Sequence, residues 1–579
     1  MNTKQWVWKY LQPQWRQALL LGVFLLTGLG LNLLNPRIMQ LFIDSAIQGR
    51  PLQALLQFGG FFLAIAIVVQ LMGVAEVYVS QNIAMVATNR IRADLTRHCL
   101  SLDMAFHNAR TPGELIERVD GDVSKLSNFL SSFLVQITLN SLLLLGVVVL
   151  LLAIDWRIGL PAAISVIVAI ISARVLNPRL ARLSAQEQQR SAELYGFLEE
   201  RLSGTEDIRA NGATTYVLRR HVERSRALLW AAVKSALAGS ASWRSMHTAI
   251  DIGTIAALII GAWLCLDGVL TLGTVYVIFA YTQMLQDPVE AITRELNDLQ
   301  QATASMGRVQ ALFNMQSSLV AAHPSVSRPL PTGALSVALS AINFAYPGDD
   351  RVLHDVTVVV PAGHTLGVLG RTGSGKTTLA RLLLRLYDPQ SGAVCLGDVD
   401  LRQVSNADLR ARVSVVTQDI QLFSASVRDN LTFFDKRIPD TDIRAALANV
   451  GLDEWLRELP KGLDTPLAAS GGALSAGEAQ LLAFARTFLR NPSLVILDEA
   501  SSRLDPATER KLDHAITRLL TGRTGIIIAH RLSTLQRVDQ ILILEDGSVR
   551  ENGPREALLR DPHSRFSQLL AVGIEEVLV

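Results

Sequence analysis

The feature that most constrains the fold is a glycine-rich loop at residues 370–377, which matches the pattern G-x-x-x-x-G-K-[ST]. It lies between an apolar run typical of a strand, 365–369, and a run typical of a helix, 379–386. In a loop of this kind, glycines let successive backbone N–H groups converge on phosphate oxygens. Lys376 is placed to reach the terminal phosphates, and the Thr377 hydroxyl to face Mg²⁺. We therefore predict that the chain binds a nucleoside triphosphate with Mg²⁺.

A second apolar run, residues 493–499, ends in two carboxylates, Asp498 and Glu499. A buried parallel strand carries its functional groups at its carboxyl end, so both side chains are expected beside the phosphate-binding loop. We predict that Asp498 holds Mg²⁺. Glu499, which points the other way, is placed to polarise a water for attack on the γ-phosphate.

The order of further landmarks resembles the ATP-binding cassette (ABC) transporters, in the form of an exporter-type half-transporter with six membrane helices fused to one cassette. Tyr346 matches the aromatic residue that stacks on adenine, and Gln418 matches the glutamine that touches Mg²⁺ and the attacking water. Residues 474–478 fall where the family has its LSGGQ signature. Asp505 matches the D-loop, and His530 matches the switch histidine that contacts the γ-phosphate. The resemblance covers the whole chain.

The resemblance and the loop together imply ATP and Mg²⁺ as cofactors and four sets of site residues. The predicted nucleotide-binding residues are Tyr346, Gly370, Arg371, Thr372, Gly373, Ser374, Gly375, Lys376, Thr377 and Thr378. The predicted catalytic residues are Gln418, Glu499 and His530, and the predicted metal ligands are Thr377, Gln418 and Asp498. The residues expected to face a partner subunit's nucleotide are Ser475, Ala476, Gly477 and Glu478, with Asp505 in the D-loop.

Long apolar runs in the first 300 residues indicate a membrane domain, in line with 49% hydrophobic and only 18% charged residues overall. Six spans are predicted, at about 18–39, 57–79, 129–154, 158–176, 249–266 and 272–285. The last is short by the criterion of ~20 residues, and its pattern continues through 286–312, which indicates a helix that leaves the bilayer toward the cassette. Six buried helices in a soluble protein would need a larger core than single domains build.

The spacing of the spans predicts the topology. Short links join the spans in pairs, whereas two long intervals separate the second span from the third and the fourth from the fifth. Because the cassette needs ATP, we expect the long intervals and both termini in the cytoplasm, and the chain as a multi-pass protein of the inner (plasma) membrane. Lys and Arg agree, since the short links hold only Arg50 and Arg157. The resemblance adds coupling helices near 105–114 and 208–216.

These patterns divide the chain into four parts. Residues 1–16, rich in Trp and Lys, are expected to form an interfacial elbow helix. A membrane domain follows at 17–316, all-α with six spans and two long cytoplasmic loops. Pro, Ser and Ala mark a linker at 317–334, and an α/β P-loop ATPase domain takes 335–579. The predicted fold is thus a multi-domain membrane protein.

Other function classes find no support. The three cysteines, Cys99, Cys265 and Cys395, lie far apart without metal-ligand spacing. A net charge of +2 and the lack of a basic cluster with interleaved aromatics argue against a nucleic-acid partner. Internal repeats are absent from the sequence, so the chain supplies one membrane domain and one cassette, whereas a family transporter needs two of each.

The signature departs from the family pattern, because Ala476 and Glu478 replace Gly and Gln. Ala476 adds a methyl group where the backbone approaches the partner's γ-phosphate, and Glu478 adds negative charge near a polyanion. Residues 465–470 also lack the acidic and glycine residues that exporters usually carry there. Heterodimeric exporters often contain one subunit with intact catalytic residues and an altered signature. The other subunit then has altered catalytic residues and an intact signature. We therefore favour a heterodimer with a second half-transporter, and a homodimer remains the alternative.

The predicted function is an ATPase coupled to transmembrane transport, exporting a lipid, drug-like compound or peptide. The alternative is a family member whose ATP cycle gates or regulates another membrane process without pumping. His247 and Asp251, near the start of the fifth predicted span, either line the substrate cavity or lie in water at its cytoplasmic end.

The assignment of Glu499 as catalytic base predicts that Glu499→Gln keeps ATP binding but lowers turnover by about 10²-fold or more, the effect of losing a positioned proton acceptor. Steady-state ATPase rates and nucleotide affinity, measured on the same preparation, test this. Turnover close to that of the unmodified chain would remove Glu499 from the mechanism.

Overall fold

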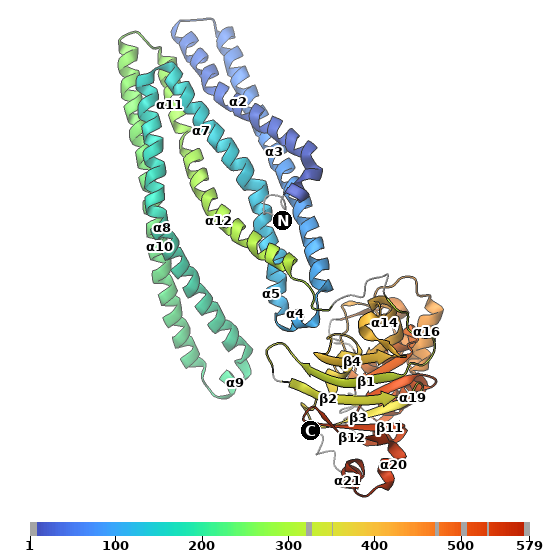
Figure 1. Ribbon diagram of the computed structural model, residues 1–579. Coiled ribbons are helices and arrows are strands. Elements are labelled where there is room, and N and C mark those ends of the chain that lie inside the picture. Colours follow the sequence, from blue (N-terminus) through green and yellow to red (C-terminus); the bar gives the residue numbers. More distant parts are fainter. Residues whose placement is uncertain are drawn as a thin grey trace. The chain divides into compact units, whose positions relative to one another are not determined.

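The computed structural model describes residues 8–319, 327–349, 351–468, 474–498, 506–529 and 532–571 (Figure 1). The chain forms two compact units. The first comprises Met1–Leu100 and Pro112–Met315, and the second comprises Ser101–Thr111 and Gln316–Val579. A short stretch of the first long interval therefore belongs to the same unit as the C-terminal half of the chain.

The first unit is all helical. Its main helices are α2 (Trp15–Ile47), α3 (Leu52–Ser101), α5 (Pro112–Ile116), α6 (Asp122–Asn128), α7 (Leu134–Ile154), α8 (Trp156–Ser203), α9 (Thr205–Ala210), α10 (Thr214–Leu266), α11 (Leu272–Gln283) and α12 (Gln286–Asn314). The π-helical turns η2 (Glu117–Gly121) and η3 (Phe129–Phe133) flank α6. Residues 8–11 are helical and lead through the 3-10 turn η1 (Gln12–Gln14) into α2, so the described part of the predicted elbow runs almost directly into the first span.

Within the described residues, five helices are long and apolar enough to cross a bilayer: Trp8–Ile47, Leu52–Ser101, Pro112–Ile154, Trp156–Ser203 and Thr214–Leu266. The predicted sixth span is not among them, because α11 ends after 12 residues at Gln283. Pro288 accounts for the break. In a continuous helix its missing N–H would have bonded the carbonyl of Met284, and its ring would clash with that carbonyl. The helix resumes as α12 and runs to Asn314, as the continuing pattern predicted.

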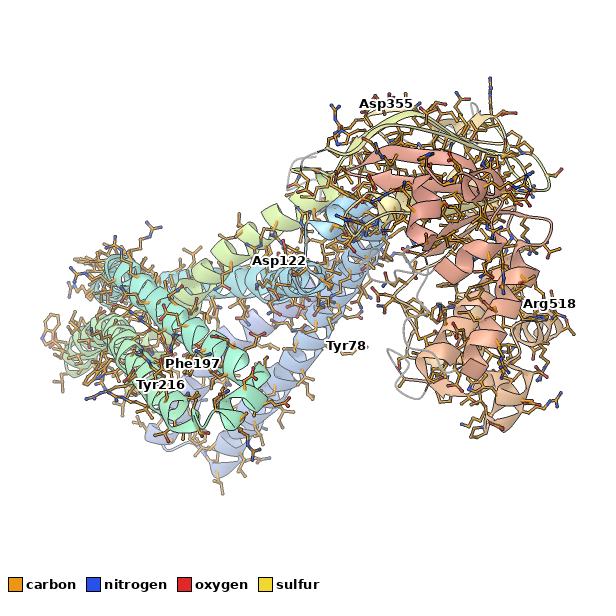
Figure 2. The ribbon with its side chains drawn as sticks, turned by 90° about the horizontal axis from the view of Figure 1, so that it is seen from below. Tyr78, Asp122, Phe197, Tyr216, Asp355 and Arg518 are labelled. Atoms are coloured by element: carbon orange, nitrogen blue, oxygen red, sulfur yellow. The ribbon has the colours of Figure 1, made fainter. Side chains whose placement is uncertain are left out.

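The second long interval is helical almost throughout. Helices α8 and α10, of 48 and 53 residues, extend far beyond the apolar runs as one antiparallel pair, and the chain reverses at Asn211–Gly212 after the short helix α9. At the far end of the pair, the Arg224 guanidinium lies 4.8 Å from the centre of the Phe197 ring, which Figure 2 shows with Tyr216 of α10. Nearer the core, a Cβ on Gly253 would fall 2.4 Å from the Ser165 side chain. Small residues thus allow the two helices to approach closely.

An ion pair with a buried carboxylate joins α6 to α12. Asp122, labelled in Figure 2, accepts hydrogen bonds from Ser305 Oγ (3.0 Å) and Arg308 Nε (2.9 Å), and a second guanidinium nitrogen completes the fork. The carboxylate is almost fully buried. Burial of a charge is tolerated here because each carboxylate oxygen has donors.

The described residues of the second unit form three sheets. The six-stranded sheet has the order β12-β11-β3-β10-β9-β6, and a four-stranded antiparallel sheet has the order β2-β1-β4-β5. The strands are β1 (Val337–Ala345), β2 (Arg351–Val360), β3 (Thr365–Leu369), β4 (Ser391–Leu396), β5 (Val399–Asp400), β6 (Val413–Val416), β9 (Leu494–Asp498), β10 (Thr524–Ile528), β11 (Gln540–Glu545) and β12 (Ser548–Pro554). The small third sheet pairs β7 (Ala425–Ser426) with β8 (Pro466–Leu467).

The helices of this unit include α4 (Met104–Asn108), α13 (Lys376–Leu383), α14 (Asn406–Arg412), α15 (Val427–Thr432), α16 (Asp440–Asn449), α17 (Asp453–Glu458), α18 (Ala476–Arg490), α19 (Pro506–Leu520), α20 (Arg555–Arg560) and α21 (Arg565–Ala571). The central parallel strands are buried on both faces. In β9, Leu494 and Ile496 face the core shared with β1, β2 and α13, whereas Val495 and Leu497 face the core shared with α15 to α19. This is the arrangement expected of a parallel sheet covered on both sides, and the predicted all-α region followed by an α/β domain is confirmed.

Thr524 connects the start of β10 to two other segments of the same unit by hydrogen bonds. Its fully buried hydroxyl donates to the Leu335 carbonyl (2.7 Å) and accepts from the Gly363 N–H (3.0 Å). The side chain at the start of β10 thereby satisfies two backbone groups that precede β1 and β3.

Thr524→Val keeps the volume of this side chain but leaves two buried backbone groups unpaired. We expect a loss of about 1–3 kcal/mol in the stability of this unit, measured as a lower Tm of the full chain. Thr521→Val is the matched control, because the exposed Thr521 hydroxyl bonds the Thr517 carbonyl in the preceding helix α19 (2.8 Å). Equal Tm values for the two variants would contradict the bridging role.

Candidate functional site

The glycine-rich loop connects β3 to α13 in a backbone conformation that requires glycine. Gly370 has φ +151°, and a Cβ there would lie 2.3 Å from the Leu544 carbonyl oxygen and 2.5 Å from Ser374 Oγ. Gly375, the residue before α13, has φ +99°, and its Cβ would lie 2.5 Å from the Leu353 side chain. The loop therefore packs closely against β11 and β2, and α13 begins directly after it.

The Lys376 side chain folds back onto the carbonyl groups of this loop. Its Nζ donates to the carbonyls of Gly370 (2.5 Å) and Arg371 (2.9 Å), and only 6% of the residue is exposed. Burial lowers the pKa of Lys376, an effect that the charge of Asp498 opposes. Ser374 Oγ is buried and has no hydrogen-bond partner among the described residues. A buried ammonium and an unsatisfied hydroxyl beside a helix N-terminus are what a bound polyphosphate would satisfy, so these residues fit a nucleotide.

The predicted metal ligands come from the first turn of α13 (Thr377), the end of β9 (Asp498) and the segment after β6 (Gln418). Asp498 is the last residue of β9, whose neighbour β10 pairs with β3 so that Ile528 lies opposite both Asp498 and Val368. On the other side, β6 pairs with β9 up to Val416, two residues before Gln418. Thr377 and Gln418 are both exposed, and Asp498 is half-buried. The sheet thus brings the three predicted ligands to one edge, at the carboxyl ends of parallel strands.

These residues suit Mg²⁺ held together with a nucleotide. Among the described residues, no group of three His, Cys, Asp or Glu side chains could hold a metal ion. A single carboxylate with hydroxyl and amide oxygens fits an ion that takes its other ligands from phosphates and water.

Tyr346 lies against the helix that follows the loop. Its hydroxyl is 3.0 Å from Thr378 Oγ1 and accepts a hydrogen bond from Arg381 (3.0 Å). Its ring meets the Tyr387 ring edge to face at 5.2 Å between centroids. Arg381 and Tyr387 were not predicted from the sequence, because nothing in their local pattern marks them: they reach Tyr346 only through the fold.

The predicted signature forms the N-terminus of α18, a 15-residue helix, with Ser475 as its N-cap. Ser475 Oγ accepts from the Glu478 N–H (3.2 Å), and Glu478 Oε2 accepts from the Ser475 N–H (2.7 Å) and hydroxyl (2.9 Å). This is a capping box, and the carboxylate of Glu478 is engaged by its own helix end. Ala476 is exposed and Gly477 is buried.

Three predicted residues, Glu499, Asp505 and His530, lie outside the described residues. In the sequence, Glu499 succeeds the last residue of β9, His530 succeeds Ala529 after β10, and Asp505 immediately precedes α19. Their assignments remain predictions.

Comparison with known proteins places these features in one family. A family model described as ABC transporter transmembrane region matches residues 18–289, and one described as ABC transporter matches residues 353–502. An ATP-dependent lipid A-core flippase of Syntrophus aciditrophicus is 30% identical over 494 residues, covering 85% of this chain and 81% of the flippase.

Two further relatives extend the similarity. A fatty acid ABC transporter ATP-binding/permease protein of Mycobacterium bovis is 29% identical over 470 residues, and the match covers 81% of this chain and 74% of the mycobacterial protein. The solved structure of a bacterial Atm1-family ABC exporter with ATP bound matches with a TM-score of 0.80 at 25% identity, covering 96% of this chain and 98% of the exporter.

The position of Lys376 predicts that Lys376→Ala weakens ATP binding by about 10-fold or more and lowers hydrolysis, because a charge-assisted contact to phosphate is lost. Nucleotide titration and ATPase rates measure both. Lys461→Ala, which removes an exposed lysine of the same unit, serves as control. Unchanged ATP binding in Lys376→Ala would contradict the placement of the site.

Proposed function

This chain belongs to the ABC transporter family as an exporter-type half-transporter, and on that premise we propose that it moves a lipid, drug-like or peptide substrate outward across the inner membrane. It is a membrane protein and an ATPase coupled to transport, and its cassette works as a dimer. The observation that carries the proposal is the glycine loop with its buried Lys376 at the edge of the parallel sheet. We place the cassette and both termini in the cytoplasm, where ATP is available.

Different residues of the site bind the phosphates, hold Mg²⁺, activate the attacking water and bind adenine. The backbone N–H groups of the loop and Lys376 hold the phosphates, and Ser374 donates its free hydroxyl to them. Thr377, Gln418 and Asp498 would hold Mg²⁺, which supplies positive charge against the phosphate oxygens. Glu499 accepts a proton from the attacking water, Gln418 orients that water, and His530 contacts the γ-phosphate. Tyr346 stacks on adenine.

The alternative is a protein whose ATP cycle gates or regulates another membrane process. The predicted set of Gln418, Glu499 and His530 favours turnover, and hence pumping, because each has the residue type that hydrolysis needs. ATP-dependent movement of a labelled lipid in proteoliposomes decides between the two. Vectorial movement supports the exporter, whereas ATP hydrolysis without movement of any tested substrate class supports the alternative.

For the substrate we put a lipid first. The relatives named above include a lipid A-core flippase and a fatty acid transporter, which supports an amphiphilic substrate.

His247 and Asp251 are partnered within the membrane domain: His247 lies 3.5 Å from a Glu290 oxygen, and Asp251 accepts from Gln286 Nε2 (3.1 Å). Both contacts join α10 to the start of α12, where the helix resumes after its break.

For the partner we propose a different half-transporter. A helix N-terminus attracts a phosphate through its partial positive charge and free N–H groups. In α18, Glu478 offsets that charge and caps the N–H of Ser475, so a partner's γ-phosphate would meet a weakened anion site. The methyl group of Ala476 adds bulk at the same exposed end. One of the two ATP sites of the dimer would therefore turn over slowly, as in a heterodimer with unequal sites. Neutral substitution within a homodimer is the competing explanation.

The charge can be removed without removing the cap, because Gln serves at this capping-box position as well as Glu. We expect the chain expressed alone to have little ATPase activity, and co-expression with an adjacent transporter gene to restore it. In the chain expressed alone, Ala476→Gly with Glu478→Gln should raise the ATPase rate, because the predicted catalytic residues of each copy then face an unaltered signature.

Mass measurement in detergent and ATPase assays test this, with Glu556→Gln as the matched loss of an exposed carboxylate. A stable, fully active homodimer whose rate is the same with and without the double substitution would rule the heterodimer out.

A further inference from the structure

The short helix α4 interrupts the membrane-domain sequence but packs within the cassette unit. Met104 and Ala105 contact the hydrophobic core that contains β1, β2 and α13, and Phe106 is buried. The Arg110 guanidinium covers the Phe106 ring at 4.5 Å. This helix lies within the predicted coupling segment 105–114.

Polar contacts hold the two ends of α4 separately. At its start, Asp103 caps the helix by accepting from the Phe106 N–H (3.0 Å), and it also accepts from Ser318 N–H (2.6 Å) and Oγ (2.7 Å). At its end, Asn108 Nδ2 donates to the Tyr387 hydroxyl (2.8 Å). One end is thus tied to the linker and the other to the segment after α13.

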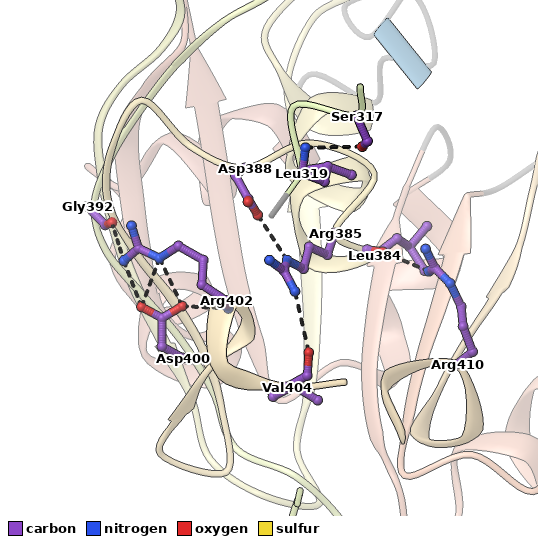
Figure 3. A network of polar contacts seen from close by, with 10 residues as sticks. All are labelled: Ser317, Leu319, Leu384, Arg385, Asp388, Gly392, Asp400, Arg402, Val404 and Arg410. Atoms are coloured by element: carbon purple, nitrogen blue, oxygen red, sulfur yellow. Dashed lines mark hydrogen bonds and ion pairs between the residues drawn. The ribbon is translucent and has the colours of Figure 1, made fainter. Parts of the chain in front are cut away.

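The segment that carries Tyr387 is rigidly held. Arg385 adopts φ +47°, is almost fully buried, and bonds Asp388 (3.1 Å) and the Val404 carbonyl (3.4 Å), as Figure 3 shows. Tyr387 itself is 7% exposed. Burial raises the pKa of Tyr387, so its hydroxyl stays neutral and remains available for hydrogen bonding.

The ring of Tyr387 faces the proposed nucleotide site. It meets Tyr346 edge to face (5.2 Å, 86°) and packs on Phe344 (5.6 Å). Tyr346 in turn touches Thr378 directly after the phosphate-binding loop. A continuous series of contacts therefore runs from the predicted adenine-stacking ring to the end of α4.

We propose that Tyr387 is a positioning residue that connects the adenine site to α4 through its ring contact with Tyr346 and its hydrogen bond with Asn108. The inference rests on the proposed function, in which Tyr346 stacks on adenine. When a nucleotide fixes the Tyr346 ring, the edge-to-face contact restricts Tyr387, and the Asn108 hydrogen bond restricts α4. Ser318 and Asp103 hold the other end of α4 by contacts that do not involve Tyr346.

Hydrogen exchange of the 101–111 segment tests the connection, using the full chain, with its partner if one is required, in lipid nanodiscs with and without Mg²⁺ and AMP-PNP. In the unmodified protein we expect nucleotide to slow exchange in α4 several-fold. Asn108→Ala and Tyr387→Phe should each abolish most of that nucleotide-dependent difference while leaving AMP-PNP affinity within about twofold. The double variant should show no further loss, because both changes break the same hydrogen bond.

Ser318→Ala is the matched control, because it removes a hydrogen bond from the other end of the same helix. It should speed exchange in α4 equally with and without nucleotide, so that the protection ratio is kept. Tyr387→Phe retains the buried ring, and its Tm reports whether the unit is still folded.

The results distinguish a missing connection through Tyr387 from a missing nucleotide site. If AMP-PNP binds and the protection ratio is unchanged in both variants, or is absent from the unmodified protein, the connection through Tyr387 is wrong while the nucleotide site stands. If either variant loses AMP-PNP affinity along with the protection, Tyr387 belongs to the nucleotide site itself and the proposal is also overturned. If the unmodified protein does not bind AMP-PNP, the proposed function fails first.

Discussion

The register of the parallel strands is the constraint on which the site depends. β3, β10, β9 and β6 are aligned so that Val368, Ile528 and Asp498 lie side by side, with Val416 next to Leu497. Backbone hydrogen bonds fix this alignment, and cores on both faces of the sheet prevent any strand from slipping by one residue, since a slip would exchange its two buried faces. The phosphate-binding loop and Asp498, the carboxylate proposed to hold Mg²⁺, thereby lie at the carboxyl ends of neighbouring strands.

Two helix N-termini in the cassette use the same electrostatics in opposite ways. At α13, the N-cap is Gly375, which has no side chain to cap the helix, and the buried Lys376 adds a positive charge. At α18, the side chains of Ser475 and Glu478 already satisfy the helix end. An anion is therefore attracted to the first helix and met by a carboxylate at the second, which is the physical basis for unequal ATP sites in the proposed dimer.

Much of the fold, including the strand–loop–helix unit of the phosphate-binding loop, was predictable because it depends on local pattern. The glycine loop between a strand and a helix needs only neighbouring residues, and the apolar runs locate five long helices that meet the length of a bilayer. The sixth predicted span is not among these five, because Pro288, three residues after its predicted end, imposes a break that hydrophobicity alone does not register. Family order of motifs then extended the prediction to Tyr346 and Gln418.

By itself, then, the sequence determined where the five long apolar helices and the phosphate-binding loop lie, and that the signature carries an added charge. Only the tertiary structure decided that Glu478 caps its own helix and that α4 joins the cassette unit. It also brought Asn108 to Tyr387, which is 279 residues away along the chain. The physical reason is range: helix periodicity and loop chemistry act between near neighbours, whereas side-chain contacts between distant segments exist only once the chain has packed.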